Sequence, residues 1–243
     1  MQTNIDITKA FMDSPSGVLS IHQLSQKLKL PYGTTYNRVH LLFEQKILQI
    51  LPQGKAKLCA LDGENPMTAN LLALGGAQST QNFMMSLPDN GKLLKKIIKT
   101  IKTKTKGKIA SAILISPDSL KSICKDLNSN LVYPNDFSNI ENTDSLSDYQ
   151  SSIDFFFIKS DDQFDENNLE TEISSMLSTY QNVSITSMVV DKETLLGMLG
   201  EEENNAGFAA YTMLHDGIIL HGFENFYEII LEAFNRKLGI HKQ

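Results

Sequence analysis

The predicted fold of this chain depends on residues 20–61, which read SIHQLSQKLKLPYGTTYNRVHLLFEQKILQILPQGKAKLCAL. Residues 20–28 have the pattern of a short helix, because Ser20 is a natural N-cap and apolar residues recur on one helical face at Ile21, Leu24 and Leu28. Pro31 ends this pattern. We therefore expect a second helix to follow the first after a tight turn.

The second helix is expected to begin at Tyr32. Its first half is polar, and its apolar stripe follows at Val39, Leu42 and Phe43. Two strands are then expected, over residues 47–51 and 55–61, joined by a turn at residues 52–54. Upstream, residues 5–12 predict an opening helix and residues 18–19 a short lead-in strand.

This order of elements resembles the winged helix-turn-helix domain of microbial transcription regulators, over about residues 1–65. The resemblance implies binding to double-stranded DNA, with the first half of the second helix at base edges and the hairpin at phosphates. The residues expected in the groove are Tyr32, Thr34, Thr35, Tyr36 and Arg38, and those expected at the DNA backbone are Lys55 and Lys57. The alternative is a winged helix that binds protein, because residues 1–65 carry only seven basic against five acidic residues.

Length and composition predict a folded protein without membrane contact. The 243 residues allow two compact domains, and a hydrophobic content of 41% supports a core in each. No apolar run approaches the roughly 20 residues that span a bilayer, and the first residues lack the order of a signal peptide. We therefore expect a cytoplasmic protein. The two cysteines, Cys59 and Cys124, have no metal-ligand spacing, and we expect both to be buried and reduced.

Charge is distributed unevenly along the chain, whose net charge is −6. Residues 92–108 hold eight lysines and no acid, whereas residues 136–172 hold eleven acids and a single lysine. Nucleic acid is therefore expected to meet the first half of the chain, and the acidic second half is expected to face away from it.

Residues 66–104 are expected to form a helical connector. Residues 67–87 have a helical pattern with a weakness at Gly75 and Gly76, and a second helix follows a turn at residues 88–91. The second helix carries lysines on one side and an apolar stripe on the other, formed by Leu93, Leu94, Ile97, Ile98 and Ile101. The stripe predicts a homodimer contact, although it could instead dock on the sheet of its own chain. The lysines form either a solvated face or a face that contacts phosphate or a partner.

Residues 105–243 are expected to form a second, α/β domain, which makes the whole chain α+β. Short apolar runs at residues 109–115, 154–158 and 183–190 predict buried strands, and polar segments between them predict helices or loops. Residues 129–150 are rich in Asn, Ser and Asp, and are expected to be a long surface loop.

About residues 90–235 are similar to the nucleotidyltransferase-like domain of archaea and bacteria, which is often fused to a winged helix. In that family a strand ending in a Gly-Ser turn precedes a Ser-Asp-x-Asp segment and an apolar strand; residues 111–117 and 151–158 are similar to these parts. Residues 189–196 and 214–226 resemble its closing pattern of strand, helix, acid-glycine turn and short strand.

The departures from this family predict that the domain has lost its chemistry. The reaction needs two metal ions held by clustered carboxylates, and a Gly-Ser turn that approaches the nucleotide phosphates. Here Ser116 and Pro117 replace the Gly-Ser turn, Ser152 replaces the first aspartate beside Asp154, and residues 183–188 offer only hydroxyls where a third carboxylate is expected. One carboxylate cannot hold two magnesium ions, so we expect no catalytic residue, no metal site and no cofactor.

These patterns together predict a sequence-specific DNA-binding transcription regulator that acts as a homodimer, with a degenerate nucleotidyltransferase-like domain as sensor or dimerisation domain. Two alternatives stay open. One is an active nucleotidyltransferase, in which Asp144 or Asp148 assists Asp154 and the winged helix recruits substrate. The other is a protein-binding adaptor that uses both domains without DNA. A hydrolase is not expected, because the histidines lack ligand spacing and no Gly-x-Ser-x-Gly sequence occurs.

Overall fold

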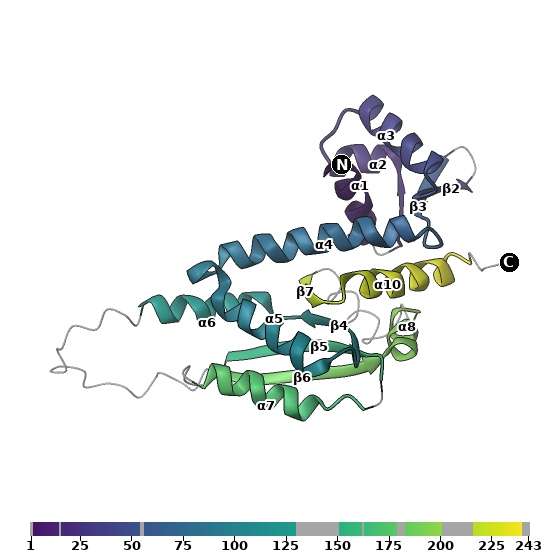
Figure 1. Ribbon diagram of the computed structural model, residues 1–243. Coiled ribbons are helices and arrows are strands. Elements are labelled where there is room, and N and C mark those ends of the chain that lie inside the picture. The colour runs from purple at the N-terminus through teal and green to yellow at the C-terminus, as the bar shows by residue number, and fades with distance from the viewer. Residues whose placement is uncertain are drawn as a thin grey trace, which may run out of the picture. The chain divides into compact units, whose positions relative to one another are not determined.

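The computed structural model describes residues 2–14, 16–53, 56–129, 151–161, 163–178, 183–200 and 216–239. The chain is mixed α and β and divides into two compact units, whose elements are drawn in Figure 1. The N-terminal unit comprises Met1–Ser79, Asp191–His215 and Gly222–Gln243. The α/β unit comprises Thr80–Val190 and Asp216–His221.

The N-terminal unit begins with the order of helices and strands that the sequence predicts. Its first elements are α1 (Gln2–Met12), β1 (Val18–Ser20), α2 (Ile21–Lys27), α3 (Tyr32–Glu44), β2 (Leu48–Gln53) and β3 (Ala56–Leu61). The strands form an antiparallel sheet in the order β1-β3-β2, with Val18 opposite Ala60 and Leu48 opposite Leu61. The prediction of two helices followed by a hairpin is confirmed.

Helix α2 begins with the N-cap that the sequence predicts. The backbone N–H of Gln23 donates to Ser20 Oγ at 3.2 Å, and the backbone N–H of Ser20 donates to Gln23 Oε1 at 2.8 Å. This reciprocal pair satisfies donors that the first turn of a helix would otherwise leave unpaired. The inward faces of α2 and α3 are buried at Ile21, Leu24, Val39 and Leu42.

Helix α4 (Pro66–Ser86) runs unbroken through Gly75 and Gly76, so the weakness predicted at these glycines does not interrupt it. The missing side chains instead let two other helices approach. A Cβ atom on Gly75 would lie 3.0 Å from Ile5 of α1, and one on Gly76 would lie 3.0 Å from the ring of Tyr227 in α10 (Phe223–Lys237). The two glycines are packing positions.

The C-terminal helix α10 belongs to the N-terminal unit, together with α8 (Lys192–Gly200). A Cβ atom on Gly17, whose φ is +64°, would lie 3.2 Å from the ring of Phe234 in α10. Helix α8 is linked to α10 by an ion pair of 2.7 Å between Lys192 Nζ and Glu232 Oε2. The predicted domain over residues 105–243 is therefore not one compact unit, because its last helices pack with the start of the chain.

The α/β unit contains one four-stranded sheet. Its elements are η1 (Pro88–Gly91), α5 (Lys92–Thr105), β4 (Ile109–Leu114), α6 (Pro117–Ser129), β5 (Ser151–Lys159), α7 (Glu166–Leu177), β6 (Val183–Asp191) and β7 (Ile218–His221). The strand order is β6-β5-β4-β7, and β4 is antiparallel to both β5 and β7. The three apolar runs predicted as strands are thus confirmed as β4, β5 and β6. The prediction that residues 183–190 form a buried strand is wrong, because β6 lies at the edge of the sheet, where Val190 is its one buried residue and Met188 is 50% exposed.

Helix α5 packs into the core of the α/β unit. Its apolar side joins side chains from β4, β5, α6 and α7 in one buried cluster that includes Leu94, Ile97, Ile101, Leu114, Leu120, Phe155, Phe157 and Ile173. The prediction that this stripe of α5 forms the dimer contact is wrong, because its central side chains are buried within their own chain. The alternative expectation, that the stripe docks on its own sheet, is confirmed.

The predicted boundaries after residues 65 and 104 also differ from those of the compact units. Helix α4 is divided after Ser79, and Thr80 Oγ1 donates to the Ile219 carbonyl of β7 at 2.7 Å. Residues 130–150, which make up nearly all of the predicted surface loop, lie outside the described residues, as does Lys55. Within the described ranges, no helix is long and apolar enough to cross a membrane.

Candidate functional site

Helix α3 exposes most of its first two turns. Tyr32 is 53% exposed, and Thr34, Tyr36 and Arg38 are also exposed. No side chain caps the start of this helix, which follows Pro31. Four of the five side chains predicted to meet a DNA groove therefore lie on accessible surface, at a helix start that presents backbone donors and a favourable dipole to an anion.

Thr35 is the exception and is corrected here. Its side chain is 0% exposed, and its Oγ1 donates to the Pro31 carbonyl at 3.2 Å. It lies on the same side of α3 as the buried Val39 and Leu42. The prediction that Thr35 contacts a base is wrong, because its hydroxyl is bonded within the helix and its side chain faces the core.

The outward face of α3 is centred on Gly33 and Asn37, which the sequence analysis did not select. At about 100° per residue, both positions lie opposite the buried Thr35. A Cβ atom on Gly33 would meet nothing within 4 Å, so the backbone is open there. Asn37 is exposed, and its amide offers the donor and acceptor pair that recognises adenine in a major groove. Counting turns from the buried stripe would have found both residues.

One side of this face carries aromatic rings. The ring centroids of Tyr32 and Tyr36 are 6.3 Å apart, and those of Tyr36 and His40 are 4.3 Å apart. Phe43 is 44% exposed, so its predicted place in the buried stripe is wrong. It follows Leu42 by one residue and therefore points about 100° away from that stripe. The exposed surface of α3 is thus more aromatic than basic.

The β2–β3 hairpin presents Lys57, one of the two lysines predicted to meet DNA phosphates. Lys57 is exposed on β3, opposite Pro52. Burial raises the pKa of the nearby Cys59 thiol to about 11, against the opposing effect of the Lys57 charge. Cys59 and Cys124 are free and buried, as predicted. The Cys59 thiol therefore stays protonated at neutral pH, and Lys57 is the group on β3 that is available to an anion.

In the α/β unit, Ser116, Ser152 and Asp154, on which the sequence resemblance rests, come together at one end of β4 and β5. The backbone N–H of Asp154 donates to Ser116 Oγ at 2.9 Å. Ser152 Oγ donates to Asp154 Oδ1 at 2.5 Å and lies 3.3 Å from Thr186 Oγ1 of β6. We call these four residues the hydroxyl cluster.

The composition of the hydroxyl cluster does not suit two-metal chemistry. Asp154 supplies its one carboxylate, and Thr186 stands on the strand where the resemblance implies a third acid. Across the described ranges, no group of three His, Cys, Asp or Glu side chains could hold a metal ion. Helix α6 begins at Pro117, which has no N–H to offer a phosphate. The cluster links the end of β4 and the start of β5 to Thr186 of β6 by hydrogen bonds, and among the described residues it lacks the acids of a magnesium site.

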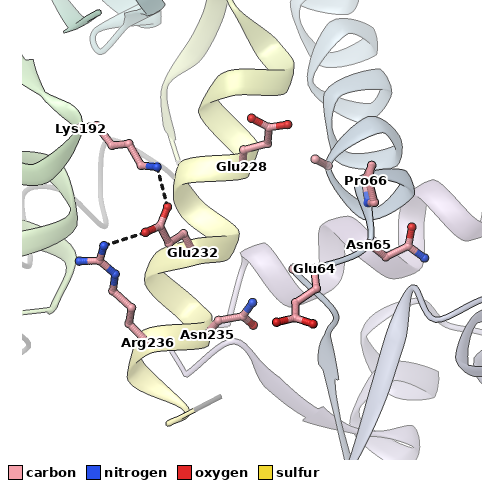
Figure 2. A pocket seen from close by; sticks show the side chains of 10 residues that line it. Glu64, Asn65, Pro66, Lys192, Glu228, Glu232, Asn235 and Arg236 are labelled. Carbon is pink, nitrogen blue, oxygen red and sulfur yellow. Dashed lines mark hydrogen bonds and ion pairs between the residues drawn. The ribbon is translucent and has the colours of Figure 1, made fainter. Parts of the chain in front are cut away.

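The N-terminal unit also has a cavity of about 610 Å³ beside α10, shown in Figure 2. Lys192 and Arg236 both point to Glu232, with N–O distances of 2.7 Å each. The hydrogen bond from Lys192, and less strongly that from Arg236, lower the pKa of Glu232 against the opposing effect of burial. Glu64 and Glu228 complete the charged lining. Because one carboxylate pairs with both cations, the charged lining gives this cavity no excess positive charge for an anion.

The structure thus presents two candidate groups of residues, the exposed face of α3 and the hydroxyl cluster. They lie in different compact units. No protein-family model, no curated protein and no solved structure matches this chain.

Proposed function

We propose that this chain is a DNA-binding transcription regulator that works by binding and not by catalysis. The observation that carries the proposal is the order α1-β1-α2-α3-β2-β3, with strand order β1-β3-β2 and an exposed first half of α3. In a winged helix-turn-helix, the helix in the place of α3 enters the major groove and the hairpin lies along the phosphates.

The proposed base contacts come from exposed residues of α3, with Asn37 on its outward face and Arg38 about 100° round the helix from Asn37. Arg38 donates two hydrogen bonds to a guanine, and Asn37 pairs with an adenine. Gly33 lets the helix backbone come close to the DNA, with Thr34 and Tyr36 beside it. Lys57 and Lys55 are proposed to contact phosphates, which adds affinity without sequence preference.

We also propose that the regulator is cytoplasmic and homodimeric. The two winged helices of a symmetric dimer would bind two DNA half-sites about one helical turn apart. A palindromic operator would then have the same two-fold symmetry as the dimer. The dimer contact does not use Leu94, Ile97 or Ile101, because these side chains are buried in their own chain. Light scattering at micromolar concentration tests this proposal, and a monomer contradicts it.

The DNA proposal is tested by selecting an operator from a random duplex library with the full chain. Gel-shift titrations then compare that operator with random DNA. Arg38→Ala is expected to weaken operator binding by about 1–3 kcal/mol, whereas Lys57→Ala weakens both DNAs alike and lowers the salt slope by about 1. Arg38→Lys is the matched control, because it keeps the charge and loses the planar fork. Unchanged affinity for both alanine variants contradicts the assignment.

The α/β unit is proposed to be a degenerate nucleotidyltransferase-like domain that serves as a sensor or dimerisation domain. The single carboxylate of the hydroxyl cluster supports this proposal. The test is incubation with labelled nucleoside triphosphates, magnesium or manganese, and candidate acceptors. We expect no transfer of label. Transfer that Asp154→Asn abolishes would make the enzyme the better description.

A protein-binding adaptor is the second candidate, because α3 exposes several large apolar side chains. Leu41 and Phe43 are both nearly half exposed, and the same helix exposes Tyr32 and Tyr36. A photo-crosslinking amino acid at position 41 separates the candidates in the cell. Crosslinks to DNA support the regulator, whereas crosslinks to one protein in the absence of DNA support the adaptor.

A further inference from the structure

Helix α5 carries a row of exposed lysines along its outer side. We call Lys92, Lys95, Lys96, Lys99 and Lys102 the lysine stripe; all five are exposed. At about 100° per residue they fall within an arc of about 120°, opposite the buried Leu94, Ile97 and Ile101. The stripe is therefore a continuous basic surface, and the apolar side of the same helix is buried in the core.

Among the described residues, little negative charge compensates the positive charge of the stripe. Helix α5 contains no acidic residue, and Lys92 has only a loose pair with Asp89 at 3.9 Å. In the described part of the chain, no acid lies within ion-pair distance of the other four lysines. Lys104, which lies off the stripe, is by contrast paired with Glu172 of α7. Like charges in a row on a helix repel one another and destabilise it. An anion bound along the row would offset this repulsion.

The mean charge density of the stripe is close to that of one nucleic-acid strand. From Lys92 to Lys102 a helix rises about 15 Å, so the five charges are on average about 3.75 Å apart along the axis, in steps of about 4.5 or 1.5 Å. One strand of duplex DNA carries one phosphate per about 3.4 Å of its axis. The stripe thus presents positive charge at nearly the density at which a DNA strand presents negative charge.

We propose that the lysine stripe is a second contact surface for duplex DNA, which binds the phosphate backbone without reading sequence. Lysine is a compact point charge that suits phosphate, and the stripe has no arginine or aromatic side chain to contact bases. A membrane surface fits less well, because the apolar side of α5 is buried and cannot enter a lipid layer. The choice of DNA as the polyanion rests on the proposed function of the N-terminal unit.

The experiment measures the salt dependence of binding to a random duplex of about 20 base pairs by fluorescence anisotropy. The variant replaces three stripe residues with glutamine: Lys95→Gln, Lys96→Gln and Lys99→Gln. Each lost phosphate contact lowers the slope of log affinity against log salt by about 0.9, so we expect a decrease of about 2–3. Between about 50 and 200 mM salt, the variant should then lose about 40-fold less affinity than the unchanged chain.

A matched pair of single charge reversals separates the stripe from net charge. Lys99→Glu and Lys125→Glu change the charge of the same unit equally, and Lys125 is an exposed residue of α6 outside the stripe. Lys99→Glu should weaken binding to any duplex at least tenfold more than Lys125→Glu. Equal effects overturn the proposal, as does an unchanged salt slope in the triple variant. Circular dichroism confirms that each variant is folded.

The same measurements separate this inference from the proposed function. If an operator is selected and Arg38→Ala weakens it, while the triple variant keeps the salt slope, the stripe proposal fails and the function stands. If no operator is selected, but random duplex binds through the stripe, the regulator fails and the stripe stands. Loss of binding to anionic phospholipid vesicles, without loss on DNA, would overturn DNA as the partner.

Discussion

Replacing Ile97 with alanine tests whether α5 belongs to the core of its own chain or to a dimer interface. Ile97 is 0% exposed and lies in the same buried cluster as Phe155 and Phe157. The change removes three carbon atoms, worth about 2–3 kcal/mol in transfer free energy at about 0.8 kcal/mol each. The cavity that remains adds to this cost, so the free energy of unfolding should fall by about 3–4 kcal/mol.

The assay is urea unfolding followed by circular dichroism, at protein concentrations that span about twentyfold, together with light scattering. We expect the same loss of stability at every concentration, and an unchanged oligomeric state. Lys99→Ala, on the exposed side of the same helix, should change stability by no more than about 0.5 kcal/mol. A variant that keeps its stability but dissociates into monomers would refute the core assignment and restore the interface.

Three further predictions concern the N-terminal unit. Gly76→Ala should destabilise the unit by about 1–3 kcal/mol in thermal unfolding, because the new Cβ atom would lie 3.0 Å from the Tyr227 ring. Gly197→Ala is the control: its Cβ atom would have no neighbour within 4 Å, so it should stabilise α8 by up to about 1 kcal/mol. Ser20→Ala should cost about 1 kcal/mol in the same assay by removing the side-chain half of the capping box with Gln23, and Ser20→Asn should restore most of it. Burial raises the pKa of Tyr227 from 10.0 to about 12, so its contribution to stability is complete below pH 10 and is lost as pH rises towards 12. Urea unfolding from pH 9 to 11 should show a smaller loss of stability in Tyr227→Phe than in the unchanged chain; the loss that remains includes that of the Cys59 thiol, whose pKa burial raises to about 11.

Local sequence determined most of the helices and strands of this protein. The Ser20 cap, the break at Pro31 and the two runs after it predicted α2, α3 and the hairpin, because capping and hydrophobic period depend on neighbours within one or two turns. The amphipathic pattern of α5 and the apolar runs of β4 and β5 were equally local. The lack of carboxylate partners for Asp154 was also predicted from the sequence, since Ser152 and residues 183–188 carry no acid where the resemblance implies one.

Tertiary structure decided what each of these surfaces contacts. The apolar side of α5 could have covered a second chain or its own sheet, and only the fold buries Ile97 beside Phe157. Likewise α8 and α10 belong to the same compact unit as the start of the chain, and Thr35 faces the core although its neighbours are exposed. The physical reason is that the helical period of apolar residues shows which side of a helix will be buried. The surface that covers this side is formed by residues far away in the sequence. The same long-range folding brings Ser116, Ser152 and Thr186 to one place.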